Sequence, residues 1–274
     1  MPLFPIDVSD RKEIGKTKEY VSAIGLGTWA IRNYRQAEEV FVYALEHGID
    51  NIDTAEIYDN GEAEKFVGRV IKRVGREKVF ITTKMKPDHL ISKERVLKAA
   101  KASIERLGVK EVDLLLVHWP NIYLPIETQI RNFEVVFIEG LARYIGVSNF
   151  NVRELEIAIN STRSAEIVVN QVHYSILHRE VERDLLPLAI KEGITIQAYT
   201  PIEKGAVIHH PIIKDLAARV KRTPIQVSLN FLISRPRVIA IPKTETMSHL
   251  KEVLGSMGWR LSEYDIEYLE RYVY

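Results

Sequence analysis

The sequence has no cysteine and almost no net charge. The absence of cysteine among its 274 residues excludes disulfide bonds, thiolate nucleophiles, iron–sulfur clusters and cysteine-based zinc sites. Charge of one sign is also lacking, because 38 basic residues face 37 acidic ones and leave a formal charge of +1. Surfaces that bind nucleic acid or anionic lipid usually carry a basic excess. We therefore expect neither nucleic acid nor a membrane among the partners.

Long apolar runs and linker segments are missing as well. No run approaches the roughly 18 residues of a membrane span, and residues 1–10 have neither the basic region nor the apolar core of a signal peptide. A cytoplasmic location is the expectation. Because no tract rich in glycine, serine or proline divides the chain, we expect a single domain over residues 1–274. The even charge and the lack of an obvious interface pattern favour a monomer.

What recurs along the chain is a short apolar run followed by an amphipathic helix. The helices are recognised by apolar residues at the spacing i, i+3, i+4, i+7 and by a glycine that follows the first two. They are predicted at 35–47, 61–73, near 92–107 and near 126–138, with a further one that starts from an N-cap pair at Asn151 and Glu154.

The apolar runs predict strands that are covered on both faces, since they are nearly continuously hydrophobic. They lie at about 23–26, 49–53, 79–83, 112–117, 144–147, 167–169, 194–198 and 238–241. Eight βα units in a domain of this size predict an α/β protein with a (β/α)8 TIM barrel. An open doubly wound sheet is the competing architecture. The segment before Ile24 is interpreted as a β-hairpin that closes the bottom of the barrel.

Polar residues follow most of these strands directly. They are Asp53, Lys84, His118, Ser148 with Asn149, Gln171, Tyr199 and Lys243. In a parallel barrel the carboxyl ends of all strands share one rim, and active sites lie there. The sequence therefore predicts that an acid, a base, an imidazole, amides and a phenol meet in one mouth.

Each of these residues also has a purely structural interpretation. Asp53 could cap a turn, and Lys84 could be a solvated surface lysine. His118 follows four apolar residues and could be a core histidine, while Tyr58 could pack in its loop. The combination on successive strand ends favours the functional interpretation, because each chemical role needs the others.

A tyrosine, a lysine, an aspartate and a histidine form a proton-donating set. The reference pKa of tyrosine, about 10, is too high for efficient proton donation at neutral pH. A lysine cation beside the hydroxyl lowers that pKa, and an aspartate keeps the lysine protonated away from water. A histidine across the mouth can hydrogen-bond the substrate oxygen. Tyr58, Lys84, Asp53 and His118 fit these four roles.

Seven segments of the sequence resemble motifs of the aldo-keto reductase family, of the prokaryotic type. The matching segments are Gly25-Leu26-Gly27-Thr28-Trp29, Asp53-Thr54-Ala55-Glu56-Ile57-Tyr58, His118-Trp119-Pro120, Gly146-Val147-Ser148-Asn149-Phe150, Asn170-Gln171, Ala198-Tyr199-Thr200-Pro201 and Ile241-Pro242-Lys243-Thr244. They occur in the family's order from about residue 13 to 253. The resemblance implies a barrel enzyme that reduces aldehydes and ketones reversibly with NADPH, with Tyr58 as the general acid.

The resemblance also implies which residues bind. For the cofactor they are Gly27, Thr28, Asp53, Ser148, Asn149, Gln171, Tyr199, Thr200, Ile202, Lys243, Thr244, His249 and Glu252. For the small carbonyl substrate they are Trp29, Tyr58, His118 and Trp119. Ser148, Asn149 and Gln171 would hold the nicotinamide amide, and its ring would stack on Tyr199.

Two features depart from the family's pattern. His249 stands where an arginine usually binds the 2′-phosphate of NADP, so we expect NADPH to be preferred over NADH by less than is usual. A last helix is predicted at 262–271 and is followed by Tyr272-Val273-Tyr274, which implies an open mouth and loose specificity. No metal is expected, because His209 and His210 lack a nearby ligand partner.

Three rival interpretations fit parts of the sequence. Gly25–Ala30 fits the G-x-G-x-x-A pattern of a Rossmann site, but the helical period begins only near Arg35 and Trp29 would crowd a pyrophosphate. A barrel hydrolase would need paired carboxylates or clustered histidines at the rim, which are lacking. The third is a cofactor-binding regulatory or redox-sensing protein on the same fold, like the potassium-channel β subunits, which keep the same motifs.

Overall fold

Eight parallel strands form the centre of the computed structural model, which describes residues 1–273. They are β3 (Leu26–Gly27), β4 (Asn51–Asp53), β5 (Phe80–Met85), β6 (Val112–Val117), β7 (Ala142–Ser148), β8 (Ile167–His173), β9 (Thr195–Tyr199) and β10 (Val238–Ala240). Each strand pairs with the next in the chain. Parallel bridges from Ile24 to Ala240 and from Gly27 to Lys243 join the first strand to the last. The predicted (β/α)8 barrel is confirmed, and the open sheet is excluded.

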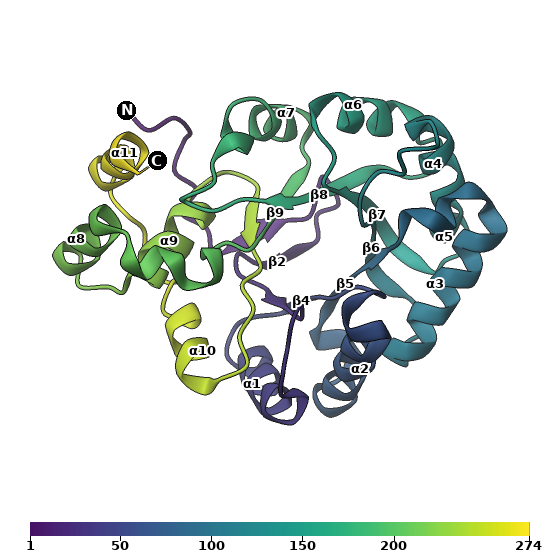
Figure 1. Ribbon diagram of the computed structural model, residues 1–274, viewed down its shortest axis with the longest axis horizontal. Coiled ribbons are helices and arrows are strands. Elements are labelled where there is room, and N and C mark those ends of the chain that lie inside the picture. Colours follow the sequence, from purple (N-terminus) through teal and green to yellow (C-terminus); the bar gives the residue numbers. More distant parts are fainter. Residues whose placement is uncertain (274) are drawn as a thin grey trace.

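Helices surround the strands on the outside (Figure 1). They are α1 (Tyr34–Glu46), α2 (Glu62–Val74), α3 (Lys93–Leu107), α4 (Ile126–Phe133), α5 (Val135–Ile138), α6 (Val152–Ser161), α7 (Leu185–Glu192), α8 (Pro211–Arg219), α9 (Pro224–Ile233), α10 (Met247–Leu254) and α11 (Glu263–Tyr272). Helix α1 buries Ala37, Val40, Phe41 and Ala44, as its apolar spacing predicts. None of the helices within residues 1–273 is long and apolar enough to cross a bilayer.

Local sequence signals explain where several helices begin. The Asn151 side chain accepts a hydrogen bond from the Glu154 N–H (3.0 Å), and the Glu154 carboxylate accepts one from the Asn151 N–H (2.9 Å). This reciprocal pair is the predicted N-cap of α6 and satisfies two backbone donors that the helix itself cannot. The helix predicted near 126–138 is instead divided into α4 and α5 at Glu134. The Glu134 carboxylate accepts three N–H bonds from residues 163–165, which ties this break to the turn before β8.

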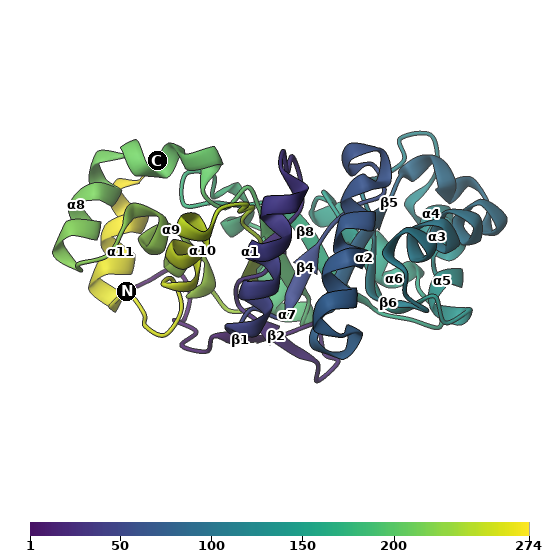
Figure 2. The same ribbon diagram turned by 90° about the horizontal axis from the view of Figure 1, so that it is seen from below.

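The inside of the barrel is a packed core at its lower end. Side chains from several strands meet there, including Phe80, Leu114, Leu116, Val169 and Ile239. The antiparallel hairpin of β1 (Arg11–Glu13) and β2 (Tyr20–Ser22) adds Ile14 and Val21 to the same cluster. Figure 2 shows the hairpin beneath the strands. The predicted closure of the barrel bottom is therefore confirmed.

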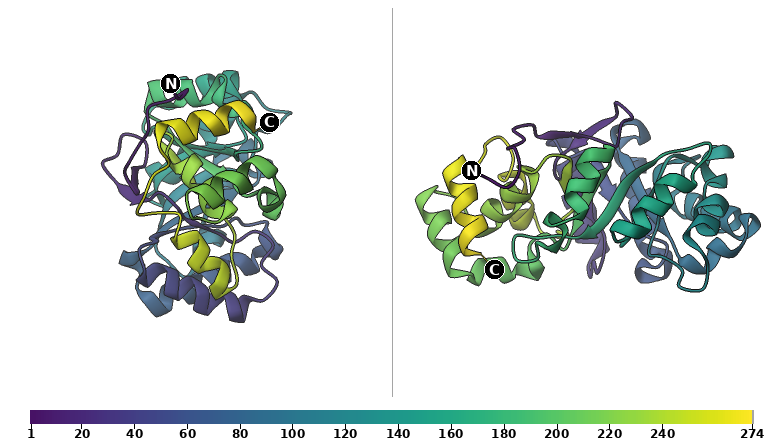
Figure 3. Two further views of the ribbon diagram at one scale, coloured as in Figure 1. Left: turned by 90° about the vertical axis from the view of Figure 1, so that its left-hand side faces the viewer. Right: turned by 90° about the horizontal axis from the view of Figure 1, so that it is seen from above.

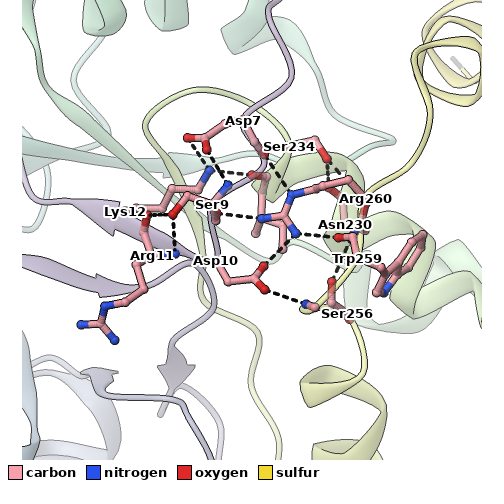
Figure 4. Close-up of polar contacts among 12 residues, drawn as sticks. Asp7, Ser9, Asp10, Arg11, Lys12, Asn230, Ser234, Ser256, Trp259 and Arg260 are labelled. Atoms are coloured by element: carbon pink, nitrogen blue, oxygen red, sulfur yellow. Dashed lines mark hydrogen bonds and ion pairs between the residues drawn. The ribbon is translucent and has the colours of Figure 1, made fainter.

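Charged contacts fix the segment before the hairpin. Figure 3 shows the N-terminus beside α11, and the Met1 amino group lies 2.9 Å from the Glu267 carboxylate. Farther along, Arg260 donates to the carbonyls of Asp7 and Ser9 and pairs with Asp10, as Figure 4 shows. These contacts join residues 1–10 to α11 and to the loop between α10 and α11.

Candidate active site

The upper mouth of the barrel brings the four predicted catalytic side chains together. Asp53 ends β4, Lys84 lies on β5, and His118 follows β6. The Lys84 Nζ lies 2.7 Å from Asp53 Oδ2 and 3.1 Å from the Tyr58 hydroxyl. The Tyr58 and His118 rings meet edge to face with their centroids 5.8 Å apart. The predicted meeting of these groups is thus present in the structure.

The backbone around Tyr58 is shaped by the residues that follow it. Tyr58 opens a 3₁₀ turn, Tyr58–Gly61, and the next two residues, Asp59 and Asn60, have φ values of 48° and 52°. Aspartate and asparagine tolerate this left-handed region better than other side chains. Gly61 has φ 90° and approaches the Arg106 side chain so closely that a Cβ would lie 2.7 Å from it. The turn directs the Tyr58 hydroxyl back toward Lys84 before α2 begins.

Lys84 is a buried cation rather than a surface lysine. Its side chain is fully buried and also donates to the Thr54 carbonyl at 2.8 Å. Burial alone would lower the pKa of Lys84, but the Asp53 carboxylate and the Tyr58 hydroxyl outweigh burial and raise that pKa above its usual 10.5. Burial also raises the pKa of Asp53, with Lys84 and Gln171 opposing the rise. The Asp53 carboxylate therefore keeps the Lys84 ammonium group charged beside the Tyr58 hydroxyl.

Tyr58 and His118 are both neutral hydrogen-bonding groups at neutral pH. Burial raises the pKa of the Tyr58 hydroxyl; Lys84 opposes the rise and Asp53 adds to it. The lowering expected from the lysine is present but is outweighed by burial, so Tyr58 keeps its proton. Burial and the Lys84 cation together lower the pKa of His118 from its usual 6.5 to about 3. At neutral pH the His118 imidazole is therefore uncharged and cannot act as an acid.

A second group of polar side chains adjoins the first. Asn149 has a left-handed backbone conformation, with φ 61°. Its side-chain amide donates to the His118 carbonyl (3.0 Å) and to the Ser148 hydroxyl (3.1 Å). The Tyr199 hydroxyl in turn donates to the Asn149 amide oxygen at 2.9 Å. Gln171 donates to Asp53 Oδ1 at 2.7 Å, which connects this group to the buried ion pair.

Gln197 belongs to this network and was missed from sequence. It lies on β9 two residues before Tyr199 and is fully buried, and its amide oxygen accepts from Gln171 at 3.0 Å. Reading only the first polar residue after each apolar run overlooks a polar residue inside a run. The signal was the two-residue period of a strand, which places Gln197 and Tyr199 on the same inward face.

The mouth fits a nicotinamide dinucleotide. It offers the half-buried aromatic ring of Tyr199 and the amides of Asn149 and Gln171. The Thr28 hydroxyl is buried and has no hydrogen-bond partner within residues 1–273. Thr28 follows Gly27, whose N–H donates to the Pro242 carbonyl just before Lys243. A polar ligand that runs from Tyr199 past Thr28 toward Lys243 would meet matching groups along its length.

The outer edge of the mouth carries the other predicted cofactor residues. Thr200 and Ile202 lie in the turn after β9, with Thr200 at φ 53°. Thr244, His249 and Glu252 lie in the loop after β10 and in α10, where His249 is exposed. Lys243 Nζ lies 2.6 Å from the Glu245 carboxylate. The sequence motifs did not predict this contact.

A hollow of about 340 Å³ opens beside Tyr58. Trp29, Ile31, Tyr34 and Ile57 are among the side chains that line it. Trp29 is 51% exposed, and the Lys204 ammonium group lies 5.5 Å from the centre of its ring. Trp119, half-exposed, lies 4.5 Å from the His118 ring between centroids, outside the lining of this hollow. Within residues 1–273 no three histidine or acidic side chains are grouped so that they could hold a metal ion.

Comparisons with known proteins agree with this geometry. The family model described as the aldo/keto reductase family matches residues 23–273. Methylglyoxal reductase YeaE of Escherichia coli (strain K12) is 30% identical over 258 residues, 91% of this chain and 90% of that protein. Glyoxal reductase of Bacillus subtilis (strain 168) is 32% identical over 250 residues, 90% of this chain and 87% of that protein.

A solved structure extends the agreement to three dimensions. An aldo/keto reductase from Klebsiella pneumoniae, in complex with NADP and acetate, superposes with a TM-score of 0.90 at 30% identity, covering 97% of this chain and 96% of that one. Sequence motifs, barrel and family match coincide, and the chain belongs to the aldo/keto reductase family of oxidoreductases.

Proposed function

We propose that this protein reduces small aldehydes and ketones to alcohols with NADPH, in a reversible reaction. The observation that carries the proposal is the Tyr58 hydroxyl, held 3.1 Å from a buried lysine cation beside a hollow of about 340 Å³. Two relatives are named as reductases of methylglyoxal and of glyoxal, and both compounds are small enough for that hollow. We therefore place short aldehydes and dicarbonyl compounds first among the substrates.

The four central side chains divide the chemistry. Tyr58 donates its proton to the carbonyl oxygen as charge develops there, and Lys84 stabilises the resulting phenolate. Asp53 keeps Lys84 charged, and the neutral His118 imidazole orients the carbonyl by a hydrogen bond. Bound NADPH supplies the hydride for the carbonyl carbon. In the reverse direction the Tyr58 phenolate would accept the proton of an alcohol.

The second polar group would position the nicotinamide. Both N–H groups of the Gln171 amide are engaged, one by Asp53 and one by Gln197. Its oxygen is therefore left to accept from a carboxamide. Ser148 and Asn149 would bind the same carboxamide, and the Tyr199 ring would stack on the nicotinamide. We assign the remainder of the dinucleotide to residues along the mouth: Gly27, Thr28, Thr200, Ile202, Lys243, Thr244, His249 and Glu252.

We further propose that NADPH is preferred over NADH, by a small margin. Lys243 and Thr244 would bind the 2′-phosphate, but His249 offers an exposed imidazole in place of a fixed charge. Titration of the protein with both coenzymes tests this order of affinity. Equal affinities would contradict the preference.

The decisive experiment compares the protein with its Tyr58→Phe variant. Consumption of NADPH is followed with a panel of aldehydes and ketones, and coenzyme binding is titrated separately. We expect the variant to bind NADPH normally and to lose activity about 10²- to 10⁴-fold, the usual contribution of a general acid. Tyr144→Phe serves as the matched control. It removes a tyrosine hydroxyl near the start of β7, at the end of the barrel away from the mouth.

The other outcomes are equally informative. If Tyr58→Phe kept full activity, Tyr58 would not be the acid. If the unmodified protein bound NADPH but turned over none of the carbonyls, a regulatory or redox-sensing role on the same fold would replace the enzymatic proposal. If it bound neither coenzyme, the cofactor assignment would fall as a whole.

A further inference from the structure

Glu245 is an acidic residue at the phosphate-binding end of the mouth. It lies in the loop between β10 and α10, and its Oε1 is 2.6 Å from Lys243 Nζ. Its Oε2 accepts from the backbone N–H groups of Arg32 (2.9 Å) and Asn33 (3.1 Å) at the start of α1. The side chain is 18% exposed. These contacts hold the carboxylate against the lysine, between the loops that follow the neighbouring strands β3 and β10.

The carboxylate stays charged in this position. Burial would raise the pKa of Glu245, but Lys243 and the two backbone N–H groups outweigh it and lower that pKa below its usual 4.5. Lys243, which is only one-third exposed, therefore already has a negative partner. A second anion that approaches Lys243 meets repulsion from the carboxylate as well as attraction to the ammonium group.

We infer that Glu245 acts as an internal anion that competes with the 2′-phosphate of NADPH for Lys243. This inference rests on the proposed binding of the coenzyme along the mouth. The 2′-phosphate carries between one and two negative charges at neutral pH, so Glu245 opposes its binding. The 2′-hydroxyl of NADH is neutral and meets no such repulsion. Glu245 is thus the residue that narrows the preference for NADPH over NADH.

Glu245→Gln is the variant that isolates this effect. Glutamine keeps an oxygen to accept from the N–H groups of Arg32 and Asn33, but it removes the negative charge. Calorimetric titration with NADP⁺ and NAD⁺ at low salt measures binding without turnover. We expect the affinity for NADP⁺ to rise about tenfold, which corresponds to 1.4 kcal/mol, and that for NAD⁺ to change less than about twofold. The gain should shrink as salt is added.

Two further variants identify the cause of any gain. If Glu245 acts through Lys243, the gain in NADP⁺ affinity should be largely lost when Glu245→Gln is made together with Lys243→Met, because contacting residues are not additive. Glu46→Gln removes an equal charge from an exposed residue at the far end of α1. It should leave both affinities unchanged.

Several results would overturn the inference. Unchanged NADP⁺ affinity in Glu245→Gln, equal tightening of both coenzymes, or a gain that survives intact beside Lys243→Met would each do so while the proposed function stands. If the unmodified protein and its variants bound neither coenzyme, the proposed function itself would fail, and the inference with it. Normal NAD⁺ binding by Glu245→Gln shows that the variant is folded.

Discussion

At the scale of single residues, the site depends on charges kept out of water. Lys84 and Asp53 are both buried and would each be costly alone, but together they form an ion pair 2.7 Å long. The electrostatic effect of that pair extends to its neighbours. The cation opposes the rise in the pKa of Tyr58 and lowers the pKa of His118. The same buried lysine thus partly offsets the effect of burial on Tyr58 and adds to the effect of burial on His118.

The depressed pKa of His118 predicts a specific loss of stability in acid. The unfolded chain would protonate this imidazole near pH 6.5, whereas the folded chain does so only near pH 3. Between these values the unfolded state binds more protons, so stability falls as the pH falls. From pH 7 to pH 4 we expect His118 to account for about 3 kcal/mol of lost unfolding free energy.

Urea unfolding at the two pH values checks this expectation. The protein should lose more unfolding free energy than its His118→Asn variant by that amount. His209→Asn, a change at an exposed histidine, should behave like the unmodified protein. Equal losses in the protein and in His118→Asn would show that His118 is protonated as easily in the folded chain as in the unfolded one.

The sequence predicted the polar residues at the strand ends that meet at the mouth. It missed residues whose contacts depend on the three-dimensional fold. Asp53, Lys84 and His118 were found because parallel strands deliver their carboxyl ends to one rim. Gln197 was hidden inside an apolar run, and the contact between Glu245 and Lys243 depends on how a loop folds. The net direction of the pKa shift of Tyr58 could not be foreseen, because it depends on the degree of burial.

At the scale of elements, periodic patterns gave the helices and strands, while local polar contacts set their ends. Helix α2 shows both. Its predicted apolar stripe is buried, but so is Glu64. The Glu64 carboxylate accepts a hydrogen bond from the Thr83 hydroxyl at 2.6 Å and forms an ion pair with Arg106. A charge within a buried face cannot be predicted from periodicity, since its partner lies on α3, 42 residues away.

The contacts of Arg260 predict a local effect on the N-terminal segment. Its guanidinium group is the shared donor for the carbonyls of Asp7 and Ser9 and for the Asp10 carboxylate. In Arg260→Met the carbonyls of Asp7 and Ser9 lose this donor, while the Asp10 carboxylate keeps the Gly258 N–H. Each hydrogen bond from a charged group contributes roughly 1.5–3 kcal/mol. We expect faster amide hydrogen exchange in residues 7–14, because local opening becomes easier there.

Hydrogen exchange followed by mass spectrometry resolves this segment from the rest of the chain. Arg183→Met is the matched control, since Arg183 is 84% exposed and pairs with its neighbour Asp184 rather than with the N-terminal segment. It should leave exchange in residues 7–14 unchanged. Uniformly faster exchange throughout the barrel of Arg260→Met would contradict a local role and indicate a global one.

At the scale of the whole molecule, topology determines where chemistry can occur. The lower end of the barrel is filled by apolar side chains and closed by the hairpin, whereas the upper end collects the polar ones. The barrel was predictable because eight similar units leave few ways to close a parallel sheet. The exact pairing of Ile24 with Ala240 was not, because the first strand is only two residues long and carries little pattern of its own.

The same asymmetry bears on assembly, for which the even charge predicted a monomer. Ile122 and Tyr123, in the loop after β6, are 85% and 87% exposed, and Trp29 and Trp119 are exposed at the mouth. A stable interface buries roughly 800 Å² on each partner, so one built on these side chains would cover the mouth, where we propose that substrate binds. We therefore expect light scattering after gel filtration to give the chain mass of 31.5 kDa at micromolar concentration. A mass of twice that value would contradict the prediction. If Ile122→Asp then restored the single-chain mass, the mouth itself would be the interface, and each site would open only when the two chains separate.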